Sequence, residues 1–326
     1  MRSARPPVAE HGARRPRRAR RLGVVILSRN PRLYSTRRLV EAARAQGHAP
    51  RVLDTLRCDL VLTRARPRIL YRGADLDPAA IHVAIPRIGA SITGYGLSVV
   101  NQLELMGVPV LASATPIARS RDKLRALQLL SRFGLEVPAT VMCRFREEVP
   151  AAVELLGGLP CIIKLTRGSQ GIGVMIAGSM AEVEGMLDTL WTLGQEIILQ
   201  QLVAESRGRD VRALVIGDRA VAAMRRTARA GEFRSNIHRG GEATAIDLPR
   251  EYAEAAVKAT RVMGLEVAGV DLLEARTGPT IMEVNGSPGF EGLEAATGID
   301  IAGLYVGHAV EFAHRRTAPV RGDHLT

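Results

Sequence analysis

Three residues with oxygen-bearing side chains, Asp271, Glu283 and Asn285, lie in two apolar segments joined by a short turn, VDLLEARTGPTIMEVNGSPG at 270–289. A polar oxygen buried on a strand costs a few kcal/mol unless it is paired. Side chains alternate along a strand, so Glu283 and Asn285 face the same way. If the connection contains an odd number of residues, Asp271 lies opposite one of them and the three oxygens converge.

Two carboxylates and one amide carbonyl form a hard oxygen site, which is how Mg²⁺ or Mn²⁺ is normally held beside a nucleotide. The alternative is three unrelated residues at the edge of a sheet, because loops often gather Asp and Asn. The hairpin therefore predicts a cation site.

A glycine-rich segment, KLTRGSQGIGV at 164–174, forms a second candidate site. Its glycines allow backbone N–H groups to turn toward an anion, and Lys164 precedes them on a strand from which its ammonium can reach a phosphate. The segment is not a P-loop, because no Gly-Lys-Ser/Thr ends it and a strand rather than a helix follows. An ordinary glycine hairpin is the alternative to a loop that folds over phosphates.

The positive charge of the chain is concentrated at its start. Of the net charge of +12 over 326 residues, eight Arg and one Glu in residues 1–21 supply +7, which leaves +5 for residues 22–326. This tail has no apolar run and is predicted to be a disordered, solvated extension that touches RNA weakly, with a transit peptide as the alternative. Aromatic residues make up only 3% of the chain, which argues against stacking platforms for single-stranded nucleic acid.

No segment is long and apolar enough for a membrane span, so no membrane partner is expected. The cysteines Cys58, Cys143 and Cys161 have neither an even count nor metal-ligand spacing. A reduced cytoplasm is therefore the expected location.

The elements that must position these residues fall into two patterns. Residues 22–114 predict a small open α/β domain with a buried parallel strand at 22–28, a helix from Ser35 to Gln46, and strands in APRVLDTL, HVAIPR and VPVLAS. A helix is predicted near Tyr95–Met106 and another at Asp122–Phe133, where Gly134 stops it.

From about residue 135 the pattern changes to strands paired by tight turns with intervening helices, which is typical of an α+β arrangement. VRALVIGDRAVAAMRR predicts a hairpin that turns at Gly217 and Asp218. Strands are predicted in PCIIKLT, VMIAG and EIILQQLV, and a helix from about Pro249 to Met263.

Several motifs together resemble the ATP-grasp carboxylate-amine ligases: Lys164 before a glycine loop, LQQLV, Asp210-Val-Arg212, FRSNIHRGG, and Asp271 followed by MEVNGSPG. Further segments are similar to the RimK family, enzymes that modify ribosomal protein: LSRNPRLYSTRRLVEAARAQGH, IPRIGASIT, ARSRDKLRALQLL and GIDIAG. The resemblance implies an ATP-grasp fold with an N-terminal pre-ATP-grasp α/β domain at 22–114 and an ATP-grasp region at 115–326. Within that region it implies a central subdomain at about 135–200 and a C-terminal subdomain at about 201–315.

The resemblance also implies residue roles. Lys164 would contact phosphate, Gln201 and Leu202 would meet adenine through the strand backbone, and Asp210 would bind the ribose side. Arg234, Ser235 and Asn236 would complete the nucleotide site, and Asp271, Glu283 and Asn285 would hold two divalent ions, Mg²⁺ or Mn²⁺. Similar proteins commonly have Glu where this chain has Gln201, and the Arg-rich extension has no counterpart to which a role can be assigned.

Such a site activates a carboxylate by phosphorylating it with ATP to an acyl phosphate, which an amine then attacks. Arg225 and Arg239 are candidates to orient the acceptor carboxylate, together with Arg226 and His238, although a solvated face is the alternative for each. No Ser or Cys nucleophile is needed, in agreement with the lack of a Gly-x-Ser-x-Gly motif.

The resemblance points to addition of L-glutamate to the C-terminus of the sixth small-subunit ribosomal protein, with release of ADP and phosphate. It also implies that the enzyme is a homo-oligomer, specifically a tetramer. A ligase for a small metabolite or an amino-acid carrier, such as an α-aminoadipate or glutathione-like acceptor, is the alternative within the class. A ribosome-associated or nucleic-acid-binding protein with a vestigial ligase site is the alternative from another class, and only the tail favours it.

Overall fold

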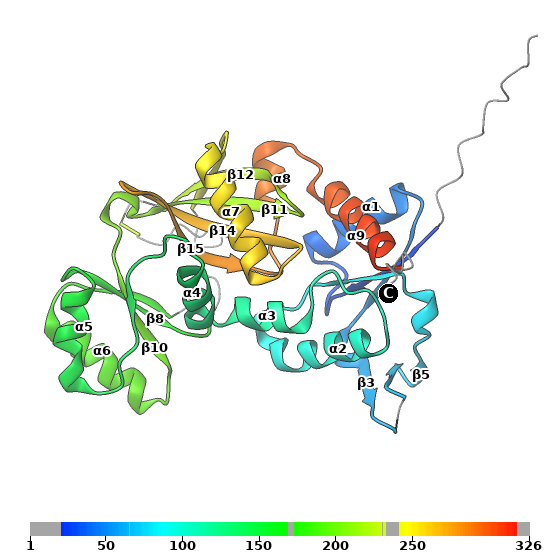
Figure 1. The fold of residues 1–326 in the computed structure, drawn as a ribbon, viewed down its shortest axis with the longest axis horizontal. Helices are drawn as coiled ribbons and strands as arrows, with labels where there is room; N and C mark the ends of the chain where they lie inside the picture. Colours follow the sequence, from blue (N-terminus) through cyan, green and yellow to red (C-terminus); the bar gives the residue numbers. More distant parts are fainter. Residues whose placement is uncertain (1–20, 65, 169–172, 230, 233–240, 318–326) are drawn as a thin grey trace, which may run out of the picture.

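The computed structural model describes residues 21–64, 66–168, 173–229, 231–232 and 241–317 (Figure 1). Near its N-terminus the chain forms a parallel sheet in the order β2-β1-β6, from β1 (Gly23–Leu27), β2 (Ala49–Leu53) and β6 (Val83–Pro86). Helix α1 (Tyr34–Ala45) connects the first two strands, and its buried face carries Leu39, Ala42 and Ala43. The predicted βαβ opening is confirmed.

Two features of this N-terminal part differ from the sequence-based prediction. The segment VPVLAS forms only an isolated parallel bridge between Ala84 and Val110, because Pro109 has no N–H with which to extend a ladder. A small antiparallel sheet was not predicted; it has the order β3-β4-β5 and comprises β3 (Cys58–Val61), β4 (Arg68–Tyr71) and β5 (Ala74–Asp75). Helix α2 (Thr93–Leu105) packs beside it.

Two short helices, α3 (Ala114–Arg121) and α4 (Lys123–Arg132), lead out of the N-terminal part. The side chain of Asp122 caps α4 by accepting a hydrogen bond from the N–H of Arg125 at 3.0 Å. Gly134 adopts a positive φ of 66° just after the helix, as expected for a stop signal.

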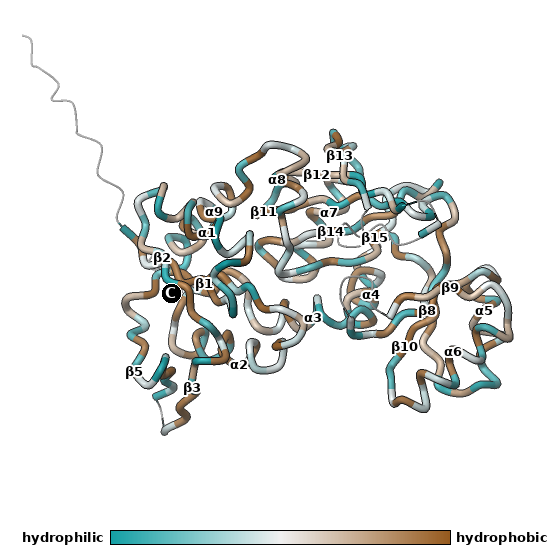
Figure 2. Tube along the Cα trace, turned by 180° about the vertical axis from the view of Figure 1, so that it is seen from behind, coloured by the Kyte–Doolittle hydropathy of each residue, from teal (hydrophilic) through white to brown (hydrophobic). Residues whose placement is uncertain are grey.

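A second unit contains a four-stranded antiparallel sheet in the order β7-β10-β8-β9. Its strands are β7 (Thr140–Val141), β8 (Cys161–Leu165), β9 (Val174–Ala177) and β10 (Ile197–Gln201). Figure 2 shows the apolar strands β8 and β10 beside two helices of mixed hydropathy, α5 (Val149–Leu155) and α6 (Met180–Thr192). These elements enclose a hydrophobic core of their own.

The third unit is a five-stranded antiparallel sheet in the order β13-β12-β11-β14-β15. Its strands are β11 (Arg209–Ile216), β12 (Arg219–Thr227), β13 (Glu242–Ala245), β14 (Val267–Ala275) and β15 (Gly278–Asn285). Helix α7 (Arg250–Met263) covers one face, and α8 (Glu291–Thr297) and α9 (Ile301–Thr317) cover the other. Short 3-10 turns lie at Thr55–Arg57, Pro78–Ala80, Ala90–Ile92, Arg146–Glu148 and Ala204–Ser206.

The N-terminal sheet and the five-stranded sheet share their hydrophobic cores. Strand β1 is buried on both faces: Val25 and Leu27 join the core that contains α7, whereas Val24 and Ile26 join the core that contains α9. Helix α9 therefore lies beside α1 although the two are at opposite ends of the chain (Figure 1).

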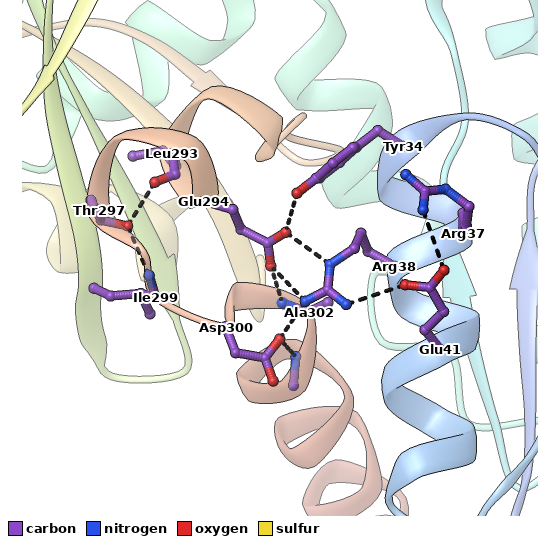
Figure 3. Close-up of polar contacts among 11 residues, drawn as sticks. Tyr34, Arg37, Arg38, Glu41, Leu293, Glu294, Thr297, Ile299, Asp300 and Ala302 are labelled. Carbon is purple, nitrogen blue, oxygen red and sulfur yellow. Dashed lines mark hydrogen bonds and ion pairs between the residues drawn. The ribbon is translucent and has the colours of Figure 1, made fainter.

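A polar network reinforces this junction (Figure 3). The carboxylate of Glu294, at 9% exposure, accepts hydrogen bonds from the Tyr34 hydroxyl at 2.6 Å and from Arg38 Nε at 3.1 Å. Arg38 also pairs with Asp300 at 2.7 Å. The first helix of the chain is thus tied to α8 and to the start of α9.

Among the residues that the structure describes, no helix combines the length and the apolar character required to cross a bilayer.

Candidate active site

The hairpin of β14 and β15 places Asp271 directly opposite Glu283, and Gly269 opposite Asn285. A bulge after Asp271 leaves Met282 as an extra residue, so Val270, Ile281 and Val284 all face the core with α7. Asp271, Glu283 and Asn285 consequently share the other face of the sheet. The structure thus selects Glu283 from the two partners that strand alternation left open for Asp271.

Asp271 is 3% exposed and fully ion-paired. Arg212 binds both of its oxygens, from Nε to Oδ1 and from Nη2 to Oδ2, each at 2.6 Å, and Arg226 Nη2 lies 3.0 Å from Oδ2. Burial alone would raise the pKa of this carboxyl, but the two guanidinium groups outweigh it and hold the pKa at about 2.

Arg226 joins Asp271 to Asp210. Its Nε and Nη2 atoms bind the two oxygens of Asp210 at 2.6 and 2.8 Å, and both side chains are 3% exposed. Asp210 lies opposite Arg226 and Arg212 lies opposite Asp271 in the strand register, so these are direct cross-strand pairs, whereas Arg226 reaches Asp271 across the intervening strand β11. The sequence motif Asp210-Val-Arg212 contained the signal for it, because residues two apart on a strand share a face.

Glu283 and Asn285 are half-buried. Asn285 Oδ1 accepts a hydrogen bond from the N–H of Ser287 at 2.9 Å, which shapes the turn that follows β15. In the described part of the chain, no three His, Cys, Asp or Glu side chains gather closely enough to hold a metal ion. The donor set of two carboxylates and one amide oxygen fits a hard cation, provided that Asp271 exchanges its arginines for it and that a ligand supplies further oxygens.

Lys164 on β8 approaches this face from the four-stranded sheet. It is 8% exposed, and its Nζ donates to Gln200 Oε1, whose amide in turn donates to Thr140 Oγ1 at 2.8 Å. Burial, helped by the nearby charge of Lys123, lowers the pKa of Lys164 to about 8, and Glu283 opposes the shift. The two sheets thus bring a lysine and a carboxylate from distant parts of the sequence within electrostatic reach.

Lys123 is a site residue that the sequence analysis missed. It begins α4, its N–H donates to the carbonyl of Thr166 at 3.1 Å, and its Nζ donates to the carbonyl of Gly168 at 3.0 Å. A cation at a helix N-terminus opposes the helix dipole, and this local conflict was the available signal. Lys123 fixes the start of the glycine loop next to Lys164.

The other predicted nucleotide-binding residues are only partly described. Gln201 is exposed at the end of β10, where its N–H donates to the carbonyl of Ala139 at 2.9 Å, and Leu202 follows it, half-buried. Gly173 has a φ of 72°, and a Cβ there would lie 2.5 Å from Leu165 Cδ1, which explains the glycine. Five predicted site residues lie outside the described residues: Arg234, Ser235, Asn236, His238 and Arg239.

The structure does not bring Arg225 to this cluster. Arg225 lies opposite Val211, which belongs to the core with α7, and it pairs with Glu274 at 2.6 Å. Because its neighbour Arg226 faces Asp271, strand alternation turns Arg225 to the opposite face of the sheet. Arg226, also considered from the sequence, is the arginine on the side of Asp271 and Glu283.

Two antiparallel sheets, one with a buried lysine and the other with two carboxylates at opposite positions of neighbouring strands, are typical of the ATP-grasp ligases. Comparison with known proteins agrees. The RimK-like ATP-grasp domain profile matches residues 120–307, and the RimK pre-ATP-grasp domain profile matches residues 22–117.

Curated relatives extend the match over nearly the whole chain. A probable alpha-L-glutamate ligase from Pseudomonas aeruginosa (strain PAO1) is 50% identical over 283 residues, which cover 87% of this chain and 93% of the relative. Another probable alpha-L-glutamate ligase, from Pseudoalteromonas translucida, is 48% identical over 91% of this chain and 98% of its own length. The chain belongs to the RimK family of ATP-grasp enzymes and is an ATP-dependent ligase.

Solved structures share the fold at low sequence identity. The ATP-grasp ligase PsnB in complex with a minimal precursor superimposes with a TM-score of 0.71 at 23% identity, over 90% of this chain and 99% of PsnB. A RimK domain protein from Sphaerobacter thermophilus gives a TM-score of 0.67 at 22% identity, over 88% and 99% of the two chains.

Proposed function

We propose that this protein uses ATP to add L-glutamate to the C-terminal carboxyl group of a protein acceptor, the sixth small-subunit ribosomal protein, with release of ADP and phosphate. The observation that carries the proposal is the placement of Asp271 opposite Glu283, within electrostatic reach of Lys164. The names of the relatives support glutamate as the amine. The precursor peptides bound to PsnB favour a peptide acceptor over a small metabolite.

In this proposal ATP lies between the four-stranded and five-stranded sheets. Lys164 and Lys123 neutralise its phosphates, Gln201 and Leu202 contact adenine through the strand backbone, and Asp210 lies on the ribose side. Arg234, Ser235 and Asn236 complete the site. Asp210 is paired with Arg226 in this structure. In the proposal this ion pair persists when the nucleotide binds, and the nucleotide contacts the pair.

Asp271, Glu283 and Asn285 would hold two Mg²⁺ ions, for which Mn²⁺ can substitute. Bound there, the ions offset charge on the phosphoryl group that moves from ATP to the acceptor carboxylate. Arg212 must release Asp271 for the ligand set to assemble, which frees a guanidinium group for the substrates. A structure of PsnB with Mg and ADP shows that this fold accommodates both ligands.

The acceptor carboxylate becomes an acyl phosphate, the amine of glutamate attacks its carbonyl carbon, and phosphate leaves. Arg239 is proposed to orient the acceptor carboxylate and to stabilise the oxyanion of the tetrahedral intermediate. Arg225, by contrast, faces α7 in this structure, so its catalytic assignment stays a prediction without geometric support.

The decisive experiment incubates the enzyme with ATP, Mg²⁺, L-glutamate and a peptide that ends in the acceptor C-terminus. Intact mass should show glutamyl additions, and the nucleotide product should be ADP. AMP and pyrophosphate would contradict the acyl-phosphate route. Turnover with α-aminoadipate or glutathione-like acceptors, but not with the peptide, would favour the small-metabolite alternative, and no ATP turnover would favour a vestigial site.

Three broader assignments accompany the proposal: a cytoplasmic location, a homotetrameric assembly, and weak contact of residues 1–21 with RNA or the ribosome. Sedimentation of the purified enzyme tests the assembly, and salt-dependent RNA binding tests the tail.

A further inference from the structure

Arg87 is a cation without an acidic partner at the junction of the N-terminal sheet and the five-stranded sheet. It follows β6, and its Nη2 donates to the carbonyl of Pro288 at 2.7 Å and to Ser35 Oγ at 3.2 Å. Its Nε and Nη1 atoms are buried and make no hydrogen bond of good geometry, although the Tyr305 hydroxyl lies within hydrogen-bonding reach of the guanidinium group. The aromatic residues Phe290 and Tyr305, both uncharged, complete its surroundings. In the described part of the chain, no carboxylate lies within ion-pairing distance of Arg87.

Arg121, the last residue of α3, is a second such cation. Its Nη2 donates to the carbonyl of Ile88, the residue that follows Arg87. No described carboxylate forms an ion pair with it either. Burial lowers the pKa of Arg121, and the charge of Arg87 lowers it further against the opposing effect of Glu283. The two guanidinium groups are therefore close enough to repel each other, with Glu283 as a nearby acid.

Ser287 adds a hydroxyl to the same place. Its Oγ is buried and has no hydrogen-bond partner, and the next carbonyl along the turn, that of Pro288, accepts from Arg87. The turn packs tightly against the end of α3, because a Cβ on Gly286 would lie 3.1 Å from Ser120 Oγ. Arg87, Arg121 and Ser287 thus surround one junction between three elements.

Unpaired buried donors cost free energy, and native structures retain them mainly where a ligand or another function requires them. The cations around Glu283 fall into two pairs. Lys123 and Lys164 interact with each other, Arg87 and Arg121 interact with each other, and Glu283 acts on one member of each pair. The two lysines lie beside the glycine loop, where they would bind the phosphates of ATP. The two arginines are therefore available to bind a carboxylate of one of the other substrates.

We propose that Arg87, Arg121 and Ser287 form the subsite for a carboxylate of the amino-acid substrate, L-glutamate. The inference rests on the proposed function. The acceptor carboxylate must react beside Glu283 and loses its charge in the reaction, whereas the carboxylates of glutamate are not consumed and keep their charge. A permanently charged guanidinium pair suits such a group, since arginine matches carboxylate geometry. A neutral amide in the same place leaves the arginines unpaired, which gives selection against glutamine.

The test compares Arg121→Met, Arg121→Lys and Ser287→Ala with the wild type in steady-state ligation of the acceptor peptide. Arg121→Met should raise the KM for L-glutamate by about 10- to 100-fold, as expected for loss of a charged hydrogen bond, with the KM for ATP changed less than about twofold. Arg121→Lys should recover part of the loss. The rate ratio of L-glutamate to L-glutamine should fall toward one in Arg121→Met.

Ser287→Ala separates ligand binding from stability. Because Ser287 Oγ has no partner in the protein, its removal should leave the melting temperature unchanged or higher, while the KM for L-glutamate rises several-fold. The increase in melting temperature that L-glutamate causes in the wild type should shrink in both Ser287→Ala and Arg121→Met.

Arg38→Met is the matched control, because Arg38 lies at the same junction but pairs with Glu294 and Asp300. It should lower the melting temperature and leave the KM for L-glutamate unchanged. Wild-type turnover with an unchanged KM for L-glutamate in the Arg121 and Ser287 variants would overturn the subsite alone. A wild type without glutamate-dependent ADP release would instead overturn the proposed function, and the subsite with it.

Discussion

At the scale of single residues, most buried charged side chains of this protein form ion pairs with a group of opposite charge. The buried cations in the described part of the chain that lack such a partner lie near Glu283. Asp210, Arg226, Asp271 and Arg212 form a continuous chain of ion pairs on one sheet face. Such pairs are costly to break on one side, because the remaining charge stays buried. Lys164, Arg121 and Arg87 have no carboxylate within ion-pairing distance among the described residues, which is the arrangement expected before an anionic substrate binds.

Glu283 is the residue on which the metal assignment depends. It lies opposite Asp271 and shares a face with Asn285, so in the proposed function it would be a ligand of both ions. Glu283→Ala should reduce ATP turnover by at least about a hundredfold, because both ions lose a ligand, while the melting temperature stays close to that of the wild type.

Metal-dependent ATP turnover and thermal unfolding of this variant are the required measurements. Asn285→Asp serves as the comparison and should be milder, since it retains an oxygen ligand and adds charge. Near wild-type turnover in Glu283→Ala would remove the metal site from the proposed function.

If Lys164 binds the phosphates as proposed, nucleotide binding is expected to depend on pH. Its pKa of about 8 in the free protein is below the ordinary value of 10.5, because it is buried. Above pH 8 the lysine is increasingly neutral, and ATP must restore its charge on binding. The dissociation constant for ATP should therefore rise by up to about tenfold per pH unit above pH 8, with proton uptake on binding.

Calorimetry at pH 7 and pH 9, in buffers with different ionisation enthalpies, measures both effects. In Lys164→Met the proton uptake should disappear and the affinity, lower throughout, should become nearly independent of pH. A wild-type affinity that is equal at pH 7 and pH 9 would show that Lys164 does not bind phosphate.

At the scale of elements, short segments join the units and place their ends at the site. Strand β15 ends at Asn285 in a turn that contacts Arg87, and α3 ends at Arg121 just before Lys123 begins α4. On the far side of the same turn, Glu294 on α8 accepts hydrogen bonds from Tyr34 and Arg38 on α1 (Figure 3). The helices thereby hold the turn against the N-terminal sheet.

Glu294→Gln should lower the free energy of unfolding by about 1–3 kcal/mol at pH 7, because a mostly buried acceptor of charged hydrogen bonds is lost. Burial would raise the pKa of Glu294, but Arg38 and Tyr34 lower it below the reference value of 4.5. A depressed carboxyl pKa stabilises the fold above 4.5 and loses this contribution as pH falls through the folded-state value.

The difference between Glu294→Gln and the wild type should accordingly be full at pH 7 and shrink below about pH 4.5. Urea unfolding at pH 7 and pH 3.5 measures it. Glu41→Gln removes the ion pairs of an exposed carboxylate with Arg37 and Arg38 in the same network and should change stability by less than about 0.5 kcal/mol. Equal effects of the two substitutions would contradict the assigned importance of Glu294.

At the scale of the whole molecule, the described residues form one large unit with shared cores and one smaller unit with its own. The four-stranded sheet and its helices α5 and α6 enclose a separate core, and this unit carries Lys164. Glu283 belongs to the large unit. A nucleotide that contacts both sheets would therefore couple the two units, and stability should rise on ATP binding.

The basic tail is expected to act separately from the chemistry. Deletion of residues 1–21 removes +7 of the net charge of +12 and none of the proposed site residues. Turnover on a free peptide acceptor should remain within about twofold of the full-length enzyme, while RNA or ribosome binding weakens and loses its salt dependence. Peptide turnover and binding at several salt concentrations test this, and loss of peptide turnover would show that the tail contributes to catalysis.

The sequence by itself determined the local features of this protein. Apolar periodicity predicted the main helices and strands, including α4 and the β11–β12 hairpin, and strand alternation predicted the shared face of Glu283 and Asn285. The motifs identified the family. These inferences succeed because helix capping, strand alternation and turn chemistry depend on neighbouring residues.

Only the tertiary structure decided which charges meet. The pairing of Asp271 with two arginines, the turn of Arg225 toward α7 and the convergence of Arg87, Arg121 and Ser287 depend on strand register and on packing between distant segments. Lys123 and the small β3-β4-β5 sheet escaped the sequence analysis for other reasons: Lys123 had only the weak local signal of a cation at a helix N-terminus, and the sheet consists of very short strands. Burial then fixes the chemistry, because a lysine with a pKa of about 8 has that value only where the fold removes it from water.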